Sequence, residues 1–413
     1  MTTEEEGSSG SDGRLETGVA FGTVTGVFTP TLLTILGVIL YVRLPWVVGN
    51  AGVLGAWALM GLAMGITLCT GLSLSSIATN TRIGHGGPYA IIQKSLGYEV
   101  GGSVGIPLYL TRPLGTAMYI FGFREGWLWV FPEHPALLVD LAVFLLVFGL
   151  AYKGADLAFR VQYVIMAIIV ASLVSIVGSP ALLGSEEPAR WLGSFPGFPE
   201  RGFGGVSPWV VFAVFFPATT GILAGANMSG DLADPRRAIP RGTLWAIAIS
   251  VVIYFGLAWA AGRMAPVSEL TGNYTLFIDR ALWPPVVLAG LLGATFSSAL
   301  AGTVGGPRIL MAMAHHDLLP GSRWMSRLAP DGEPRNAVLL TGGLTLAALM
   351  MRDLNAVAPL LTMFFLITYS VINVVLLVES GLGLASFRPT LRVPWVVPLL
   401  GTLGSVFTMF VVN

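Results

Sequence analysis

Long apolar stretches dominate the hydropathy pattern of the chain, and short polar, glycine-rich or proline-rich segments separate them. A helix that crosses a bilayer needs about 20 apolar residues, which divides the chain into about eleven predicted crossings. They lie near residues 20–48, 53–78, 87–121, 136–152, 158–179, 207–227, 241–261, 283–313, 336–351, 354–378 and 393–413. The pattern therefore predicts an all-α integral membrane protein that forms one bundle.

Two crossings carry residues that a continuous membrane helix disfavours. Residues 29–43 of the first contain hydroxyl and glycine residues at their centre, and residues 215–225 of the sixth contain Pro217 and Gly221. Glycine costs about 1 kcal/mol in a helix interior, and proline removes a backbone donor. We therefore expect two half-helices in each crossing, with an unwound middle at residues 34–37 in the first. The spacing favours a five-plus-five inverted-repeat transporter bundle with discontinuous spans 1 and 6. Two kinked structural helices are the alternative.

The composition agrees with a membrane protein. Hydrophobic residues make up 54% of the chain and charged residues 11%, against about 25% charged in soluble domains. The mean hydropathy is +0.77. The net charge is zero, which gives no reason to expect a nucleic-acid partner. Cys69 is the single cysteine, so no disulfide can form within the chain.

Motifs for catalysis are absent from the sequence. The chain has four histidines, no GxSxG motif and no lysine that would complete a phosphate-binding loop. His315, His316 and Asp317 are adjacent, so their side chains point in different directions, which disfavours a resident metal site. We therefore expect neither an enzyme nor a cofactor.

Basic residues gather in the loops on the side where the chain starts, including residues 236–241 and 323–335. The opposite loops carry fewer basic residues and mix them with acidic ones. The positive-inside rule then predicts a multi-pass cell-membrane protein with a cytoplasmic N-terminus. Residues 1–17 are acidic and rich in glycine and serine, which predicts a disordered cytoplasmic segment. Residues 18–413 are expected to form the transmembrane transporter domain.

Several sequence blocks, spread over nearly the whole chain, carry a family resemblance. They are GVFTPTLLTILGVILYVRLPWVVGNAG, GGPYAIIQKSLG, AMYIFGFREG, FFPATTGILAGANMSGDLADPRRAIPRGT, ATFSSALAGTVGGPRIL and APLLTMFFLITYSVINVVL. In these blocks the chain resembles the cation-chloride cotransporters of the amino acid-polyamine-cation superfamily, as a short member of prokaryotic type. The resemblance implies the same inverted-repeat bundle. We find no counterpart of that family's large external domain, cytoplasmic regulatory domain or twelfth span, so a homodimer is left open.

The resemblance implies a potassium site in the middle of the bundle. Its ligands would be the carbonyls of Thr34, Ile35 and Pro217, the hydroxyl of Thr220 and the phenol oxygen of Tyr119. A hard cation prefers several oxygen ligands, and unwound backbone supplies them. Thr34 replaces the asparagine that is usual in the family, which puts potassium selectivity in question.

The resemblance also implies two chloride sites. One would use the amides of Gly37, Val38 and Ile39, and the other the amides of Gly221, Ile222 and Leu223 with the hydroxyl of Tyr369. The N-terminus of a helix binds anions through backbone N–H groups, so no charged side chain is needed.

The serine pair of the ATFSSAL block resembles the sodium site of the sodium-coupled branches. Ser297 and Ser298 would bind the ion together with the carbonyls of Leu33, Leu36 and Ala294. The potassium-chloride branch lacks this pair, so its presence favours a sodium-dependent cycle. The alternative is that a serine hydroxyl bonds back to its own helix.

Arg43 and Glu125 match a pair that closes the external gate in the family. Charges at membrane depth need partners or water, so a pair that forms in one state and opens in another is physically reasonable. The alternative is two interfacial side chains that reach water separately.

We therefore expect secondary active cotransport of chloride with sodium, potassium or both by alternating access. The partners would be the transported ions and the lipid bilayer, with no metal other than the transported alkali cations. The alternative is transport of an amino acid or another small organic solute on the same fold, with a carboxylate on the amides of Gly37 to Ile39. A passive channel is a further class, but a midplane break together with a gate favours a carrier.

Overall fold

The computed structural model describes residues 21–80, 86–153, 162–183, 190–199, 202, 204–227, 229, 232–330, 332–382 and 387–412. The segment predicted to be disordered, residues 1–17, lies outside the described residues. Within them the regular structure is helical, and the one extended pairing is an isolated bridge between Phe21 and Leu232. The prediction of an all-α protein is confirmed.

Every predicted crossing coincides with a helix or a group of helices. The elements are η1 (Val24–Phe28), α1 (Thr29–Ile35), α2 (Val38–Val42), α3 (Leu44–Asn80), α4 (Pro88–Val130), α5 (Ala136–Lys153), α7 (Gln162–Val177), α8 (Pro180–Leu183), α9 (Pro208–Phe215), η3 (Phe216–Ile222), α10 (Leu223–Asn227), α11 (Pro235–Met264), α12 (Val267–Gly272), α13 (Leu276–Asp279), α14 (Pro284–Ala314), α15 (Ser322–Met325), α16 (Arg335–Leu349), α17 (Leu354–Gly381) and α18 (Val396–Val412). Among the described residues, eight of these helices or helix groups are long and apolar enough to cross a membrane, and α16 and α18 are shorter apolar helices.

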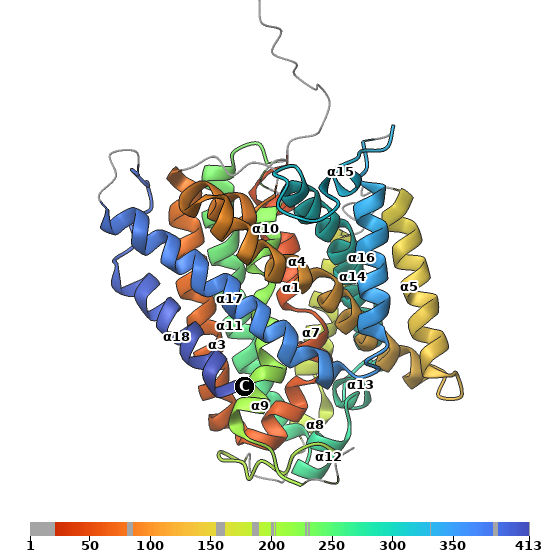
Figure 1. Cartoon of the computed structure of the whole chain (residues 1–413). Coiled ribbons are helices and arrows are strands. Elements are labelled where there is room, and N and C mark those ends of the chain that lie inside the picture. Colours follow the sequence, from red (N-terminus) through yellow and green to blue (C-terminus); the bar gives the residue numbers. More distant parts are fainter. Residues whose placement is uncertain are drawn as a thin grey trace, which may run out of the picture.

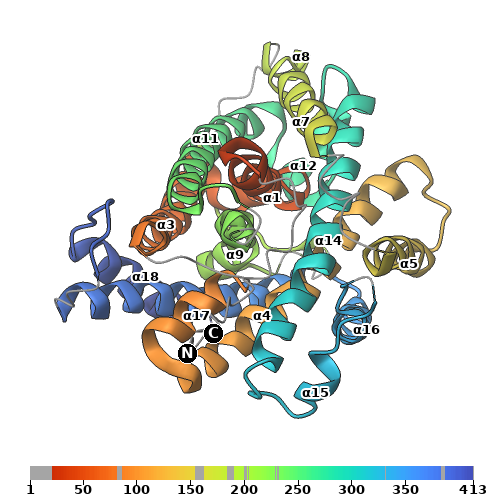
Figure 2. The same ribbon diagram turned by 90° about the horizontal axis from the view of Figure 1, so that it is seen from above.

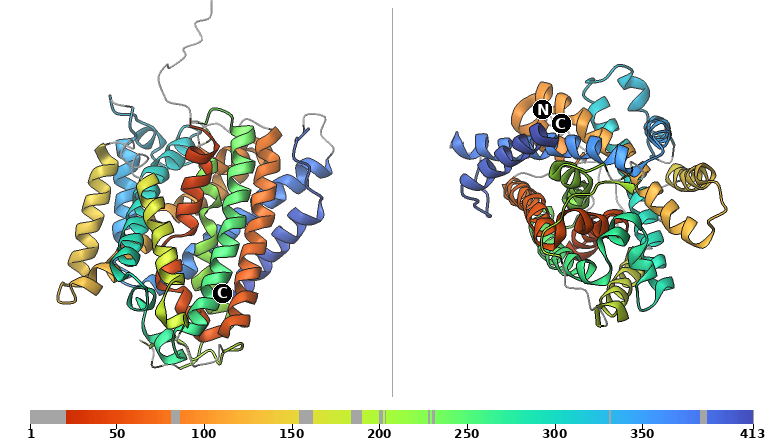
Figure 3. Two further views of the ribbon diagram at one scale, coloured as in Figure 1. Left: turned by 180° about the vertical axis from the view of Figure 1, so that it is seen from behind. Right: turned by 90° about the horizontal axis from the view of Figure 1, so that it is seen from below.

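The interrupted crossings lie at the centre of the bundle. Seen from above, α1 and α9 are surrounded by α3, α11, α7, α14, α4 and α17 (Figure 2). The helices α5 and α16 lie together at one edge, and α18 lies against α17 at another (Figures 1 and 3). This arrangement removes the first and sixth crossings from lipid, so their polar backbone atoms can face a protected interior.

The first crossing breaks between α1 and α2. Helix α1 ends at Ile35, Leu36 has a ψ of 35°, and Gly37 has φ −87° and ψ −149°. The break therefore covers Leu36 and Gly37, and Thr34 is still helical. The predicted interruption is confirmed, but the unwound segment is shorter than residues 34–37.

The sixth crossing is interrupted in a different way. Between α9 and α10 the chain does not unwind, but tightens into the 3-10 helix η3, in which Pro217 occupies the first turn. A 3-10 helix replaces the i+4 hydrogen bonds of the α-helix by i+3 bonds, and inside a longer helix it often marks a functional hinge. The prediction of two half-helices with an unwound segment between them is therefore wrong for the sixth crossing. The chain stays helical there and changes from α to 3-10 geometry.

Gly221 allows the two interrupted crossings to touch. A methyl group added to it would lie 2.8 Å from the Ile35 side chain and 3.0 Å from the carbonyl oxygen of Thr31. Any larger residue would separate η3 from α1, because real Cβ atoms do not approach so closely. The sequence therefore fixes the close contact on which the central site depends.

Candidate functional site

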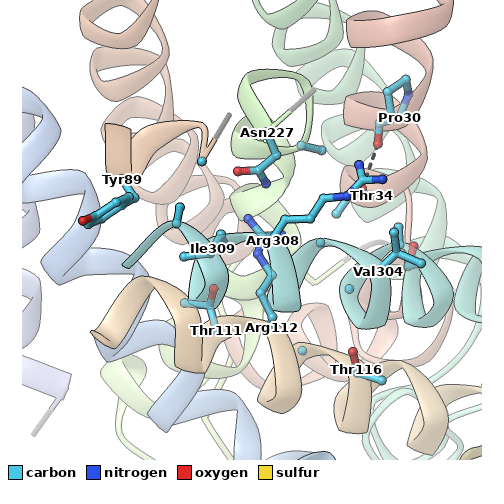
Figure 4. A pocket seen from close by; sticks show the side chains of 18 of the residues that line it. Pro30, Thr34, Tyr89, Thr111, Arg112, Thr116, Asn227, Val304, Arg308 and Ile309 are labelled. Atoms are coloured by element: carbon cyan, nitrogen blue, oxygen red, sulfur yellow. Dashed lines mark hydrogen bonds between the residues drawn. The ribbon is translucent and has the colours of Figure 1, made fainter. Parts of the chain in front are cut away.

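A cavity of about 480 Å³ lies between α1, α4, α14, α17 and the η3 and α10 segments. Its lining begins with Thr34, Tyr119 and Ser298 and reaches Gln93, near the start of α4, and His316, just after the end of α14, on the side of the bundle where η1 begins. We call this side the N-terminal side. Figure 4 shows Thr34, Arg112 and Tyr89 along this cavity. The volume is typical of small-molecule pockets, about 300–1,000 Å³. The cavity can therefore hold ions with water or a small organic solute.

The opposite side of the bundle is sealed by the start of α3 and a loop. Trp46 is fully buried and donates from Nε1 to the Gly197 carbonyl at 3.1 Å. The Gly197 amide in turn donates to Oδ1 of buried Asn50 at 2.8 Å. Next to these contacts, the Val53 amide donates to the Arg190 carbonyl at 2.9 Å. The bundle is therefore open on its N-terminal side and closed on the other.

The side chains of the predicted potassium site face the cavity. Thr34, Tyr119 and Thr220 all line it, although they come from three different segments. The Thr34 hydroxyl donates to the carbonyl of Pro30 at 2.7 Å. The hydroxyl oxygens of the two threonines can still coordinate a cation, because a hydroxyl oxygen carries two lone pairs.

Two of the three carbonyls of that site, those of Ile35 and Pro217, already accept side-chain hydrogen bonds. The Ile35 carbonyl accepts a bond from the Tyr254 hydroxyl at 2.7 Å, and the Pro217 carbonyl accepts one from Thr220 at 2.8 Å. A carbonyl oxygen has two lone pairs, so an acceptor direction remains on Ile35, whereas the Pro217 carbonyl also lies within the i+3 bonding of the 3-10 helix η3. Tyr254 was not predicted from the sequence, and its contact with Ile35 joins residues 219 positions apart.

The predicted sodium site is partly assembled. Ser297, Ser298 and Leu33 line the cavity, whereas Leu36 and Ala294 are buried away from its wall. In the described part of the chain, the Ser298 hydroxyl is buried and has no hydrogen-bond partner. Ser298 therefore does not bond back to its own helix in this structure. An unpartnered buried hydroxyl is an available ligand.

The first predicted chloride group lies behind the cavity wall. Gly37, Val38 and Ile39 are buried and do not line the cavity. Among the described residues no backbone carbonyl accepts a bond from the amides of Gly37 or Val38. A methyl group on Gly37 would lie 3.4 Å from the Tyr119 ring, which does line the cavity. Tyr119 therefore separates these amides from the open space.

The residues of the second predicted chloride site do not lie together around the cavity. Gly221 lines the cavity, but Ile222 and Leu223 are buried away from it. Tyr369 is fully buried, and its hydroxyl lies 3.5 Å from the Thr219 carbonyl. In this structure the four residues do not surround one common space.

The predicted gate pair is not formed in this structure. Arg43 is only 2% exposed, donates from Nε to Oδ1 of Asn355 at 3.0 Å, and lies over the Tyr274 ring at 3.7 Å. The Glu125 carboxylate lies 3.7 Å from Arg124. Arg43 and Glu125 are both described, and no ion pair joins them. On the closed side, Arg43 is held by an amide and an aromatic ring instead.

Arg112 lines the cavity but is not among the predicted site residues. It lies in α4, and its side chain extends into the cavity (Figure 4). The signal was available, because an arginine inside a predicted crossing is unusual and marks functional sites in membrane proteins.

The profile of the family described as amino acid permease matches residues 26–412. This chain belongs to the amino acid permease family. This family member is 32% identical to solute carrier family 12 member 2 of Mus musculus, over 96% of this chain and 37% of that protein. It is 33% identical to solute carrier family 12 member 9 of Rattus norvegicus, over 95% of this chain and 48% of that protein.

A third relative is solute carrier family 12 member 1 of Homo sapiens, 32% identical over 96% of this chain and 41% of that protein. The matches confirm the resemblance that the sequence blocks carry, and they agree with a multi-pass membrane transporter. The chain spans less than half the length of these relatives.

Proposed function

We propose that this amino acid permease family member carries chloride together with sodium, potassium or both across the membrane by alternating access. The observation that carries the proposal is a central cavity that is open on one side of the bundle and sealed on the other. It reaches the helix break beside Thr34. The similarity to solute carrier family 12 supports the choice of ions.

In the proposed cycle, cations bind the oxygens at the inner end of the cavity. Thr34, Tyr119 and Thr220 would take potassium, and Ser298 would take sodium. Oxygen ligands from hydroxyls and freed carbonyls suit both hard cations. Chloride would bind the amides at the start of α2 once Tyr119 moves from Gly37, since helix N-termini attract anions.

Alternating access requires the sealed side to open. Arg43 would then leave Asn355 and Tyr274, and an ion pair with Glu125 would belong to another state of the cycle. The basic loops support a cytoplasmic N-terminus in a cell membrane, so the present cavity would face the cytoplasm. We also propose that residues 18–413 form the transporter domain and residues 1–17 a disordered cytoplasmic segment. The homodimer that the sequence leaves open is tested by mass measurement in detergent.

A second candidate function is transport of an amino acid or another small organic solute. The cavity volume favours it, because about 480 Å³ exceeds what bare ions need. A carboxylate would then take the place of chloride at the amides of α2.

Uptake into proteoliposomes separates these functions. The purified protein is reconstituted, and chloride-36 and rubidium-86 uptake are measured while each counter-ion is replaced in turn, with protein-free liposomes as the control. We expect chloride uptake that stops when both sodium and potassium are removed. Chloride flux that continues without any co-ion would indicate a channel, and uptake of amino acids without ion uptake would support the second candidate.

A further inference from the structure

Arg112 is a charged side chain that the predicted ion sites leave unexplained. Its Nε and Nη2 atoms are buried and have no hydrogen-bond partner within the described residues. A guanidinium group has only donors, so each of these atoms needs an acceptor. Burial of a charged group without a partner costs free energy, and inside a membrane protein such a group usually marks a ligand or ion path.

Thr116 lies one helical turn beyond Arg112 on the same face of α4, since residues four positions apart are neighbours on a helix. Its Oγ1 atom is also buried without a partner in the described part of the chain, and both residues line the cavity. Both side chains point from α4 toward α14 (Figure 4). Three unpartnered polar atoms, each able to donate a hydrogen bond, therefore belong to two neighbouring residues of the cavity lining.

Two glycines of α14 leave room for these side chains. A methyl group on Gly306 would lie 3.0 Å from Cβ of Arg112, and one on Gly302 would lie 2.6 Å from Oγ1 of Thr116. Helix α14 thus packs on the stem of Arg112, and the guanidinium group extends beyond it. The packing holds the donors in place before any ligand binds.

The charges around the cavity favour an anion. Among the described residues, the arginines and acidic residues that line it are Arg112, Arg308 and Glu333, and the lining also includes His315 and His316. In the described lining, two guanidinium groups against one carboxylate leave an excess of positive charge. A cavity with walls of low dielectric concentrates such a field and draws in ions of opposite charge.

We propose that Arg112 and Thr116 form a chloride subsite on the α4 wall of the cavity. Nε and Nη2 of Arg112 and the hydroxyl of Thr116 donate to the ion. This subsite is distinct from the amide groups at Gly37 and Gly221. It deepens the proposed function, on which it rests, by giving chloride a first position on the path from the N-terminal side.

Chloride binding to purified variants tests the subsite. The unfolding temperature of the full chain in detergent is measured while N-methylglucamine chloride replaces N-methylglucamine gluconate, and the half-saturating chloride concentration is read from the shift. The variants are Arg112→Gln, Arg112→Lys and Thr116→Val, the last of which removes only the hydroxyl. Arg263→Gln is the matched control, because Arg263 lies over the Trp259 ring at the end of α11, away from the cavity.

We expect Arg112→Gln to raise the half-saturating chloride concentration at least about tenfold, which corresponds to about 1.4 kcal/mol. Thr116→Val should raise it by a smaller factor, Arg112→Lys should keep part of the affinity, and Arg263→Gln should match the wild-type. If Arg112→Gln does not fold, Thr116→Val decides the question.

If the wild-type binds chloride and Arg112→Gln and Thr116→Val bind it with the same affinity, the proposed subsite is wrong and the proposed function still stands. Absence of chloride binding and chloride uptake in the wild-type would overturn both. Stabilisation of the wild-type by acetate but not by chloride would overturn the assignment of a halide.

Discussion

Replacement of Ser298 by alanine should have two effects of opposite sign. Ser298 lines the cavity, and within the described residues its hydroxyl is buried without a hydrogen-bond partner. In the sodium-free protein it contributes no hydrogen bond to the fold. In the proposed sodium complex it is an ion ligand. The alanine variant should therefore be more stable than the wild-type without sodium and less responsive to sodium.

The magnitudes follow from the cost of buried polar groups. An unsatisfied buried donor or acceptor costs about 1–3 kcal/mol, so Ser298→Ala should raise the free energy of unfolding without sodium by about 1 kcal/mol. A polar contact to a charged group contributes about 1.5–3 kcal/mol, so the sodium affinity should fall about tenfold or more.

Both effects can be measured on one preparation. The unfolding temperature is recorded in sodium chloride and in N-methylglucamine chloride, and sodium-dependent chloride-36 uptake is measured in proteoliposomes. Ser405→Ala is a matched control, because the buried Ser405 hydroxyl donates to the Gly401 carbonyl at 2.8 Å. That variant should not gain stability and should keep its sodium response. A Ser298→Ala variant that is less stable without sodium and retains the wild-type sodium affinity would show that Ser298 is not a sodium ligand.

Three other changes test separate parts of the site. Tyr119→Phe should weaken the dependence of uptake on potassium without lowering the unfolding temperature, and an unchanged potassium affinity would remove Tyr119 from the site. Arg43→Gln should speed hydrogen exchange in α2, because it loses a charge-assisted bond to Asn355 of about 1.5–3 kcal/mol; exchange at the wild-type rate would show that Arg43 does not hold the closed side. Gly52→Ala should lower the stability by about 1–3 kcal/mol, because Gly52 has a φ of 70° and a methyl group there would lie 2.6 Å from the loop backbone. Gly256→Ala, where a methyl group meets no atom within 4 Å, is its control in thermal unfolding, and equal melting of the two variants would contradict the argument.

The sequence alone was sufficient to predict those properties of the protein that depend on short stretches of chain. The apolar runs predict the crossings, because the length of a membrane helix is set by the bilayer and not by its neighbours. The break in the first crossing follows from Gly37 and the residues around it. The family also follows from the sequence, since its motifs are contiguous blocks. The central position of the first and sixth crossings agrees with their polar and glycine-containing middles.

Only the tertiary structure decided which polar groups meet and which stay without a partner. Arg43 lies against Asn355, 312 positions away in the chain, and no local pattern selects that amide over Glu125. Ser298 lines the cavity with Arg112 and Thr116, and α4 and α14 approach one another where Gly302 and Gly306 meet Thr116 and Arg112. The physical reason is that hydropathy and helix breaking are local free energies, whereas hydrogen-bond partners and cavity walls arise from the packing of segments that are distant in sequence.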